Sequence, residues 1–257
     1  MGKIIAIVNQ KGGVGKTTSA VNLSAALHEL GLRTLLVDFD PQANATSGLG
    51  IEKRKIENSV YDVVINGVDA KEAIIQTKYG DVLPSSSDLA GAAVELIGTP
   101  SREYQLKNAL ATLRFDYDAI FIDCPPSLEL LTLNGLCAAD SIIVPVQCEY
   151  FALEGLADLM NTLRAVKKKL NTHLDLFGVI LTMFDGRTNF SNQVAQAVRS
   201  HFPGKVFASV IPRNVRLAEA PSHGIPVMNY DRSSRGSVAY RNLAQEVAKK
   251  LGVETTV

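Results

Sequence analysis

Two lysines, three glycines and two threonines fall within residues 9–18, which read NQKGGVGKTT. Glycines let backbone N–H groups approach phosphate oxygens closely, and a helix that starts in such a stretch adds partial positive charge. We expect Lys16 to reach the β- and γ-phosphates of a nucleotide and the Thr17 hydroxyl to bind Mg²⁺. A glycine-rich turn that only joins a strand to a helix would not need these side chains. The residues expected around the phosphates are Lys11, Gly12, Gly13, Val14, Gly15, Lys16, Thr17 and Thr18.

The phosphate-loop pattern G-x-x-x-x-G-K-[ST] is met here except at its first position. Gln10 stands where that pattern has glycine, and Lys11 brings a second lysine into the loop. The sequence K-G-G-x-G-K-T-T resembles the deviant Walker-A motif of the superfamily that contains ParA, MinD and the nitrogenase iron protein. The resemblance implies a P-loop nucleotide hydrolase in which Lys11 and Lys16 are both catalytic.

Two aspartates, Asp40 and Asp123, stand at the ends of apolar runs that predict buried strands at residues 34–37 and 118–123. Because parallel α/β sheets bind ligands at the carboxyl ends of their strands, we expect both aspartates near the phosphate loop. Asp123 would contact Mg²⁺ through a water molecule. Asp40 would orient the attacking water and lie in the outer coordination shell of the metal. The simpler alternative for Asp40 is a cap in the loop that follows it.

Apolar periodicity places these residues on an alternation of strands and helices. The expected strands cover residues 4–8, 34–37, 81–84, 118–123, 142–146, 176–182 and 206–210. The expected helices cover residues 19–30, 60–65, 70–75, 89–97, 103–113, 128–138, 153–170, 215–220 and 237–251, and residues 42–58 are expected to form a loop. This order predicts a single α/β domain over residues 1–257, with a mostly parallel twisted sheet flanked by helices on both faces.

The composition, 46% hydrophobic and 20% charged, is typical of a soluble globular protein. No run of eighteen apolar residues is present, so no membrane span is expected. A strand begins directly after the N-terminus and leaves no room for a signal peptide. The three cysteines are odd in number and lack C-x-x-C spacing. We therefore expect reduced thiols in a cytoplasmic protein, the alternative being a metal or iron–sulfur site.

The net charge is zero, but the charges are unevenly distributed. Residues 176–251 contain ten lysines and arginines against four aspartates and glutamates. This asymmetry is compatible with one basic face, although solvated arginines on helices would give the same count. In the same region Pro212 and Asn214 follow a predicted strand, where a proline ring can pack on adenine and an amide can hydrogen-bond to it. The alternative for Asn214 is the N-cap of the short helix that follows.

Four longer segments resemble the chromosomal ParA/Soj partitioning ATPases. They read LLVDFDPQANATSGLG, IFIDCPPSL, VPVQCEYFALEGL and IPRNVRLAEAPSHG, and the similarity extends from Met1 to about Lys250. The resemblance implies an ATPase that hydrolyses ATP to ADP and phosphate at a low intrinsic rate, with Asp40 as the hydrolytic carboxylate. It also implies that ATP is held between the two subunits of a homodimer. Lys11 would reach the phosphates bound by the other subunit, and Gly12 would allow the close approach.

The resemblance further implies DNA binding. ATP-bound dimers of this family bind double-stranded DNA without sequence preference, and Arg187, Arg213 and Arg216 match the positions responsible. Residues that would extend this basic surface are Lys205, Arg232 and Arg235. A ParB-like centromere-binding partner would stimulate hydrolysis, which dissolves the dimer and releases the DNA. The protein would then be cytoplasmic and associated with the nucleoid.

Other members of the superfamily give alternative functions. A MinD-like cell-division ATPase would bind membrane through a basic amphipathic C-terminal helix, but residues 242–251 offer only Lys249 and Lys250 on a mixed face. We therefore expect no stable membrane association. A metabolic member would form an amide or act in biotin synthesis, and would consume a small carboxylate. A nitrogenase-like iron protein is disfavoured, because Leu130 and Leu131 stand where that family has a cluster-binding cysteine.

Overall fold

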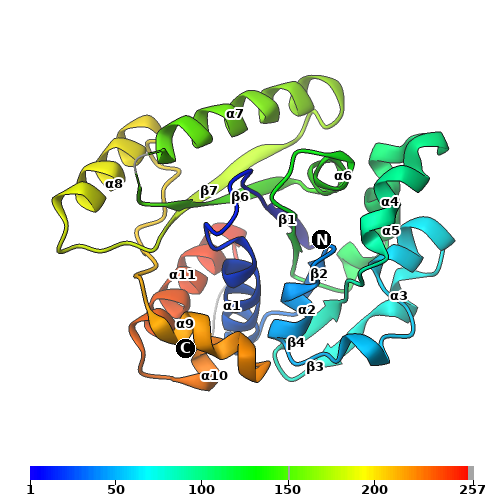
Figure 1. The fold of residues 1–257 in the computed structure, drawn as a ribbon, viewed down its shortest axis with the longest axis horizontal. Coiled ribbons are helices and arrows are strands. Elements are labelled where there is room, and N and C mark those ends of the chain that lie inside the picture. Colours follow the sequence, from blue (N-terminus) through cyan, green and yellow to red (C-terminus); the bar gives the residue numbers. More distant parts are fainter. Residues whose placement is uncertain (150, 254–257) are drawn as a thin grey trace.

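One sheet of seven strands runs through the computed structural model, which describes residues 1–149 and 151–253 (Figure 1). The strands are β1 (Lys3–Ile7), β2 (Thr34–Asp38), β3 (Ile75–Thr77), β4 (Gly80–Leu83), β5 (Ala119–Asp123), β6 (Ser141–Gln147) and β7 (Asp175–Thr182). Their order across the sheet is β3-β4-β2-β5-β1-β6-β7. Strand β3 is antiparallel to β4, and all the other neighbouring pairs are parallel. The predicted α/β fold with a mostly parallel sheet is confirmed.

Strand β1 explains why helices cover both faces of this sheet. Its side chains alternate between the faces, as in any strand. Ile4 and Ala6 belong to one hydrophobic cluster and Ile5 and Ile7 to another, and all four are buried. Because both faces of the strand are apolar, both must be covered.

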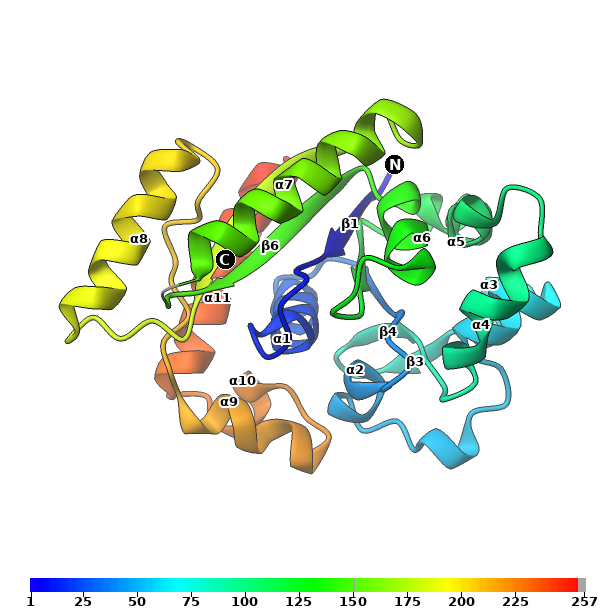
Figure 2. The same ribbon diagram turned by 45° about the horizontal axis from the view of Figure 1, so that its top comes forward.

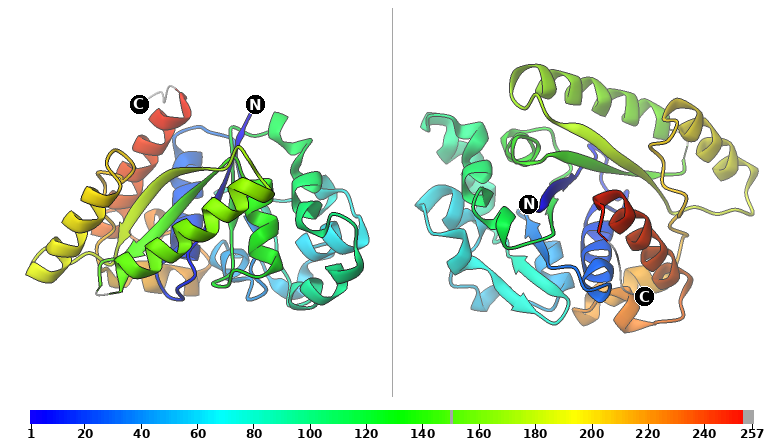
Figure 3. Two further views of the ribbon diagram at one scale, coloured as in Figure 1. Left: turned by 90° about the horizontal axis from the view of Figure 1, so that it is seen from above. Right: turned by 180° about the vertical axis from the view of Figure 1, so that it is seen from behind.

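The helices divide between the two faces according to these clusters (Figure 3). Helices α4 to α8 contribute apolar side chains to the cluster that contains Ile4, and α1, α2, α10 and α11 contribute to the one that contains Ile5. The α-helices are α1 (Lys16–Glu29), α2 (Asn44–Gly48), α3 (Ala70–Ala73), α4 (Leu89–Glu95), α5 (Gln105–Leu110), α6 (Leu130–Ala138), α7 (Ala152–Lys169), α8 (Asn189–His201), α9 (Val215–Glu219), α10 (Val227–Tyr230) and α11 (Arg235–Leu251). Within the described ranges no helix is long and apolar enough to span a bilayer.

Strand register brings the ends of three strands level with one another. Asp123 at the end of β5 pairs with Ile7 at the end of β1, and on its other side with Asp38 at the end of β2. The glycine-rich loop joins the end of β1 to α1 (Figure 2). It therefore leaves the sheet beside these two aspartates. The expectation that the loop and Asp123 share one edge is confirmed, and Asp40, two residues beyond Asp38, lies near enough for its charge to act on Lys16 of the loop.

The predicted strand at residues 206–210 is wrong. Only Val206 pairs with β7 there, as an isolated bridge to Val179. The Phe207 N–H still donates to the Val179 carbonyl at 3.0 Å, but those of Ala208 and Ser209 donate to the carboxylate of Glu246 on α11, at 2.8 and 2.7 Å. A side chain thus takes the place of a strand as hydrogen-bond partner for these two residues, which interrupts the pairing until the Ile211 N–H donates to the Leu181 carbonyl at 2.8 Å.

Other differences concern short elements. The expected loop at residues 42–58 contains α2 and a 3₁₀ turn at Lys53–Lys55, and the predicted helix at 70–75 ends at Ala73 before β3 begins. Helix α8, which follows β7, was not predicted. Tyr150 and residues 254–257 lie outside the described residues, so the segment VPVQCEYFALEGL is described only in part.

Candidate nucleotide-binding site

The glycine-rich loop turns sharply from β1 into α1. Gly13 and Gly15 have φ of +74° and +91°, a conformation that glycine adopts without steric cost, and Gly15 is the N-cap of α1. The Thr182 hydroxyl at the end of β7 donates to the Val14 carbonyl at 2.8 Å, which fixes the loop to the sheet. The backbone N–H groups at the start of α1 are therefore held where an anion can bind them.

Lys16 is the first residue of α1 and is only 7% exposed. Its ammonium group donates to the Lys11 carbonyl at 3.0 Å, so the side chain folds back along the loop. Burial lowers the pKa of Lys16, while the charges of Asp123 and Asp40 oppose that shift. The predicted phosphate lysine thus lies between the loop and both predicted carboxylates.

Asp123 and its register partner Asp38 are completely buried side by side. Neither carboxylate oxygen of Asp123 accepts a well-formed hydrogen bond within the described chain. Burial first, and then the charge of Asp38, raise the pKa of Asp123 well above its ordinary value, while Thr17 and Lys16 favour its charged form. Two unpaired carboxylate oxygens beside the Thr17 hydroxyl fit a hydrated Mg²⁺ ion, which prefers oxygen ligands and keeps several waters.

Asp40 lies at the lip of the sheet in a network of hydrogen bonds. The carboxylate of Asp38 accepts from the backbone and hydroxyl of Thr46, both at 2.7 Å, and from the Asp40 N–H at 3.3 Å. The Thr46 hydroxyl accepts from the Ser85 N–H at 3.0 Å, and the Ser85 hydroxyl donates to the Asp40 carbonyl at 2.8 Å. The Asp40 side chain itself accepts from the Gln42 N–H, as in a turn cap. One carboxylate oxygen of Asp40 therefore caps the following turn. The hydrogen bonds of the Asp40 N–H and carbonyl groups fix its backbone.

Lys11 is not a free charge in the single subunit. Its ammonium group forms an ion pair with Glu149, which follows β6. Its neighbour Gly12 is open on its outer side, because a Cβ there would meet no atom within 4 Å. The single subunit therefore gives no reason for glycine at position 12, and the reason expected from the resemblance is contact with a second subunit.

A cavity of about 350 Å³ adjoins the phosphate loop. Gly15 and Thr18 line it on one side, and Pro212 and Asn214 line it on the other. Asn214 is also the N-cap of α9, because its side-chain oxygen accepts from the Arg216 N–H at 3.0 Å. Asn214 can therefore be the N-cap of α9 and also contact adenine, since its amide nitrogen stays available to a base in the cavity.

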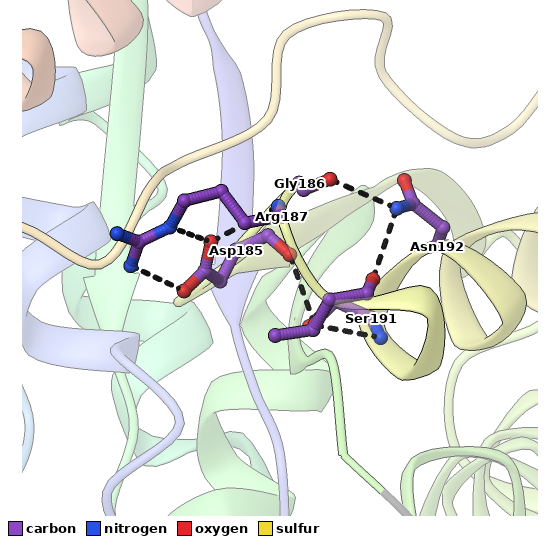
Figure 4. Close-up of polar contacts among 6 residues, drawn as sticks. Asp185, Gly186, Arg187, Ser191 and Asn192 are labelled. Atoms are coloured by element: carbon purple, nitrogen blue, oxygen red, sulfur yellow. Dashed lines mark hydrogen bonds and ion pairs between the residues drawn. The ribbon is translucent and has the colours of Figure 1, made fainter.

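The structure brings Arg187 and Arg213 together beside the end of β7. Pro212 forms a bridge with Phe184, which places the two segments side by side. Arg187 forms an ion pair with Asp185 at 2.8 Å (Figure 4). Arg213 forms no ion pair with a carboxylate in residues 1–149 and 151–253, but its charge adds to that of Arg187 in lowering the pKa of Asp185.

Arg216 lies on α9, on the same segment as Arg213. It forms ion pairs with Glu219 at 2.7 Å and Asp231 at 3.3 Å. The expected extension of this surface to Lys205 is wrong, because Lys205 pairs with Asp175 at the start of β7, at the opposite edge of the sheet. Sequence reasoning assigned Lys205 to the basic surface because of its charge alone. Its ion pair with Asp175 instead holds it near the start of β7.

Several residues of the site were missed by sequence reasoning. They are Asp38, Thr46 and Ser85 around Asp40, Glu149 beside Lys11, and Asp185, Glu219 and Asp231 beside the arginines. A signal existed only for Asp38, as the first aspartate of the DFD triplet at 38–40. The others are common polar residues whose partners are set by the fold.

Comparisons with protein families, known sequences and solved structures all found proteins similar to this chain. The family model described as an AAA domain matches residues 2–176. The chain is 58% identical over 250 residues to the sporulation initiation inhibitor protein Soj of Bacillus subtilis, covering 96% of this chain and 99% of that protein. It is 50% identical over 252 residues to the chromosome partitioning protein ParA of Myxococcus xanthus, covering 97% and 89%. A crystal structure of cobyrinic acid a,c-diamide synthase from Mycobacterium smegmatis, with bound ADP and magnesium, superposes with a TM-score of 0.86 at 40% identity and covers 100% of this chain and 99% of that one.

Proposed function

The chain belongs to the ParA/Soj family of chromosome-partitioning ATPases, and on that premise we propose that ATP switches it into a DNA-binding dimer. As an ATPase of this family it uses ATP and Mg²⁺. In the proposed cycle, ATP closes two copies of the chain around two nucleotides. The closed dimer binds double-stranded DNA of the nucleoid, and a ParB-like partner stimulates hydrolysis and release.

The residues around the loop have distinct parts in hydrolysis. The Thr17 hydroxyl and the buried Asp123 would hold Mg²⁺, which when bound neutralises charge on the phosphates. Lys16, held against the loop, would bind the phosphates of the same subunit. Asp40, on a backbone fixed by Asp38 and Ser85, would orient the attacking water.

Lys11 would act on the other subunit's nucleotide. A cation supplied across the interface offsets charge on the transferring phosphoryl group, and so makes hydrolysis depend on dimerisation. For this the side chain must leave Glu149, with which it pairs in the single subunit. The open flank at Gly12 supports close approach of a second backbone at this point.

One observation carries the proposal for DNA: the nucleotide cavity and the basic surface share a segment of chain. Pro212, Arg213 and Asn214 line the cavity, and the side chains of Arg213 and Arg216 are exposed to solvent. A nucleotide that orders this segment would order the arginines as well. Exposed arginines that bind phosphates give affinity without reading base sequence.

Binding to a random-sequence duplex tests the proposal. Affinity is measured without nucleotide, with ADP and with ATP, using Asp40→Ala to slow turnover. We expect binding only with ATP, weakened by salt and by Arg216→Glu. Each arginine that holds one phosphate should contribute about 0.9 to the slope of log affinity against log salt. Lys205→Glu, at the opposite sheet edge, is the matched control and should retain binding.

Two results would contradict the proposal. ATP-dependent binding to liposomes without DNA binding would favour a MinD-like function. Turnover of a small carboxylate with ATP would favour an amide-forming function, as in the name of the Mycobacterium smegmatis protein. We favour partitioning because identity is higher to the Soj and ParA relatives, 58% and 50%, than to that protein, 40%.

A further inference from the structure

Gly50 and Gly224, far apart in sequence, form a backbone-to-backbone contact beside the nucleotide site. Both have positive φ, +78° and +65°. A Cβ on Gly50 would lie 2.8 Å from the Gly224 carbonyl oxygen, and a Cβ on Gly224 would lie 2.6 Å from the Gly50 Cα. Because the clashing atoms are backbone, a side chain at either position can be accommodated only if the two segments move apart.

Gly50 ends the segment that begins at the hydrolytic Asp40. The Asp40 carbonyl accepts from the Ala43 N–H, α2 follows directly, and the Gly50 N–H donates to the Ser47 carbonyl at 3.0 Å. Thr46, in the middle of α2, is bound to the buried Asp38. The position of Gly50 therefore follows the position of the backbone around Asp40.

Gly224 ends the segment that begins at Arg213 and contains α9 and a 3₁₀ turn at Ala220–His223. Shortly after it, the Val227 N–H donates to the Asn22 side chain at 2.8 Å, and the same side chain donates to the Thr18 carbonyl at 2.8 Å. Asn22 is a buried residue of α1. These hydrogen bonds anchor the chain beyond Gly224 to the helix that follows the phosphate loop. If Gly224 is displaced, the residues before it, including α9, must therefore move.

The two segments have room to move relative to each other. A cavity of about 420 Å³ separates α2 from the turn at Ala220–His223 and reaches Thr17 at the start of α1. Figures 1 and 2 show α2 opposite the chain between α9 and α10. The glycine contact is therefore a point of close approach at the rim of an otherwise open space.

We propose that Gly50 and Gly224 are positioning residues that couple the nucleotide site to the arginine surface. A change of the Asp40 segment on ATP binding moves Gly50, which moves Gly224 through their contact and so shifts α9 with Arg216. Glycine is needed at both positions because a side chain would hold the segments apart in every nucleotide state. This inference rests on the proposed ATP-dependent DNA binding and concerns how that dependence arises.

Alanine substitutions with matched controls test the coupling. Gly50→Ala and Gly224→Ala break the contact. Gly67→Ala and Gly204→Ala introduce the same backbone strain, at φ of +73° and +72°, but their Cβ atoms meet nothing within 4 Å. The measured quantity is the ratio of DNA affinity with a non-hydrolysable ATP analogue to that without nucleotide. We expect at least a roughly fivefold loss of this ratio in the contact variants, with analogue affinity retained and the controls near wild type.

Two further measurements separate coupling from a general loss of structure. Because both substitutions break one contact, the double variant should lose no more of the ratio than either single variant. Hydrogen exchange of amides 215–224, measured without DNA, should slow on addition of the analogue in the wild type but not in Gly224→Ala. If Gly224→Ala fails to fold, Gly50→Ala reports on the same contact.

The outcomes distinguish this inference from the proposed function. If the wild type shows no ATP-dependent DNA binding, the proposed function fails, while the exchange measurement still decides the coupling. Equal exchange protection by the analogue in wild type and contact variants would overturn the coupling, even if DNA binding is confirmed. An unchanged affinity ratio in both contact variants would overturn it as well.

Discussion

Arg187 is held by the carboxylate of Asp185, two residues before it. Its Nε and Nη2 atoms donate to the two carboxylate oxygens at 2.9 and 2.8 Å, and its backbone N–H donates at 3.1 Å. The arginine side chain is otherwise 90% exposed. A guanidinium group proposed to bind phosphate therefore already has an anionic partner, with which DNA must compete.

Asp185→Asn should strengthen ATP-dependent DNA binding by roughly three- to tenfold at low salt, because it frees Arg187 and removes a negative charge. A fluorescence-anisotropy titration measures this. Asp175→Asn is the control, since it breaks the ion pair with Lys205 at the opposite sheet edge with the same change in charge. Equal effects of the two substitutions would mean that only net charge matters.

The ion pair between Asp185 and Arg187 also predicts that DNA affinity gains nothing from protonation of Asp185 between pH 5.5 and 8. Arg187 lowers the pKa of Asp185 to about 2, so this carboxylate stays charged at any pH at which DNA binding is measured. Its small stabilising effect is present above its ordinary pKa and lost only as the pH falls through about 2. Between pH 5.5 and 8 we expect no gain in DNA affinity from Asp185 protonation. A rise toward pH 5.5 that Asp185→Asn abolishes would contradict this.

Glu149→Gln should favour the ATP-bound dimer, because it releases Lys11 from its partner in the same subunit. Lys11→Ala should leave ATP binding by the single subunit nearly unchanged but lower hydrolysis about 10²-fold or more. Sedimentation with an ATP analogue and single-turnover hydrolysis measure the two effects. If Lys11→Ala and Glu149→Gln change dimerisation in the same direction, Glu149 does not compete for Lys11.

Thr46→Val should lower the hydrolysis rate with little change in nucleotide affinity. It removes the hydroxyl that donates to Asp38 and accepts from Ser85, and Ser85 in turn holds the Asp40 carbonyl. Leaving these buried groups unpaired should also cost about 1–3 kcal/mol of unfolding free energy. Thr162→Val, at a partly exposed position of α7 far from this network in sequence, is the control. A destabilised variant with an unchanged hydrolysis rate would place the network outside catalysis.

The buried carboxylate pair predicts that the empty protein loses stability as the pH rises. Burial is the main cause that raises the pKa of Asp38 to about 6, and that of Asp123 is also raised. The folded state therefore binds more protons than the unfolded state between the ordinary carboxyl pKa and about 6. The unfolding free energy should fall across that window, by about 1.4 kcal/mol for each unit by which folding raises a carboxyl pKa.

Urea unfolding at several pH values measures this effect, in EDTA and with Mg²⁺ and ADP. The fall with pH should be smaller with the metal and nucleotide present, because a cation then compensates the charged carboxylates. Asp123→Asn should also reduce the fall in EDTA. A stability that rises from pH 4.5 to 7 in EDTA would contradict the prediction.

The sequence predicted those parts of the site that depend on local pattern. Residues 9–18 and the apolar runs ending at Asp40 and Asp123 specify their own conformation, and parallel pairing then brings them to one edge. The interactions that hold these residues join segments distant in sequence. Glu149 beside Lys11 and Ser85 beside Asp40 have no local pattern, since any polar residue suits a strand end until the neighbouring strand is known.

The fold errors have a similar origin. Residues 206–210 have the composition of a strand, but Glu246 of α11 binds the amides that a ladder would need. Helix α2 spans only Asn44–Gly48 and is fixed by Thr46 at the buried Asp38 rather than by an apolar stripe. In both places the hydrogen bonds of one carboxylate determine the local structure more strongly than secondary-structure propensity does. This carboxylate is the bidentate Glu246 in the first case and the buried Asp38 in the second.

Two carboxylates are buried side by side near a single ammonium group, that of Lys16, so the protein without Mg²⁺ and nucleotide should be less stable than the liganded forms of its cycle. A ligand that binds only the folded state lowers the unfolded fraction by a factor of 1 + [L]/Kd. Proteases that act on unfolded chains will therefore degrade the empty form fastest. The lifetime of this protein in a cell should follow the supply of ATP and magnesium, so that starvation reduces its amount as well as its activity.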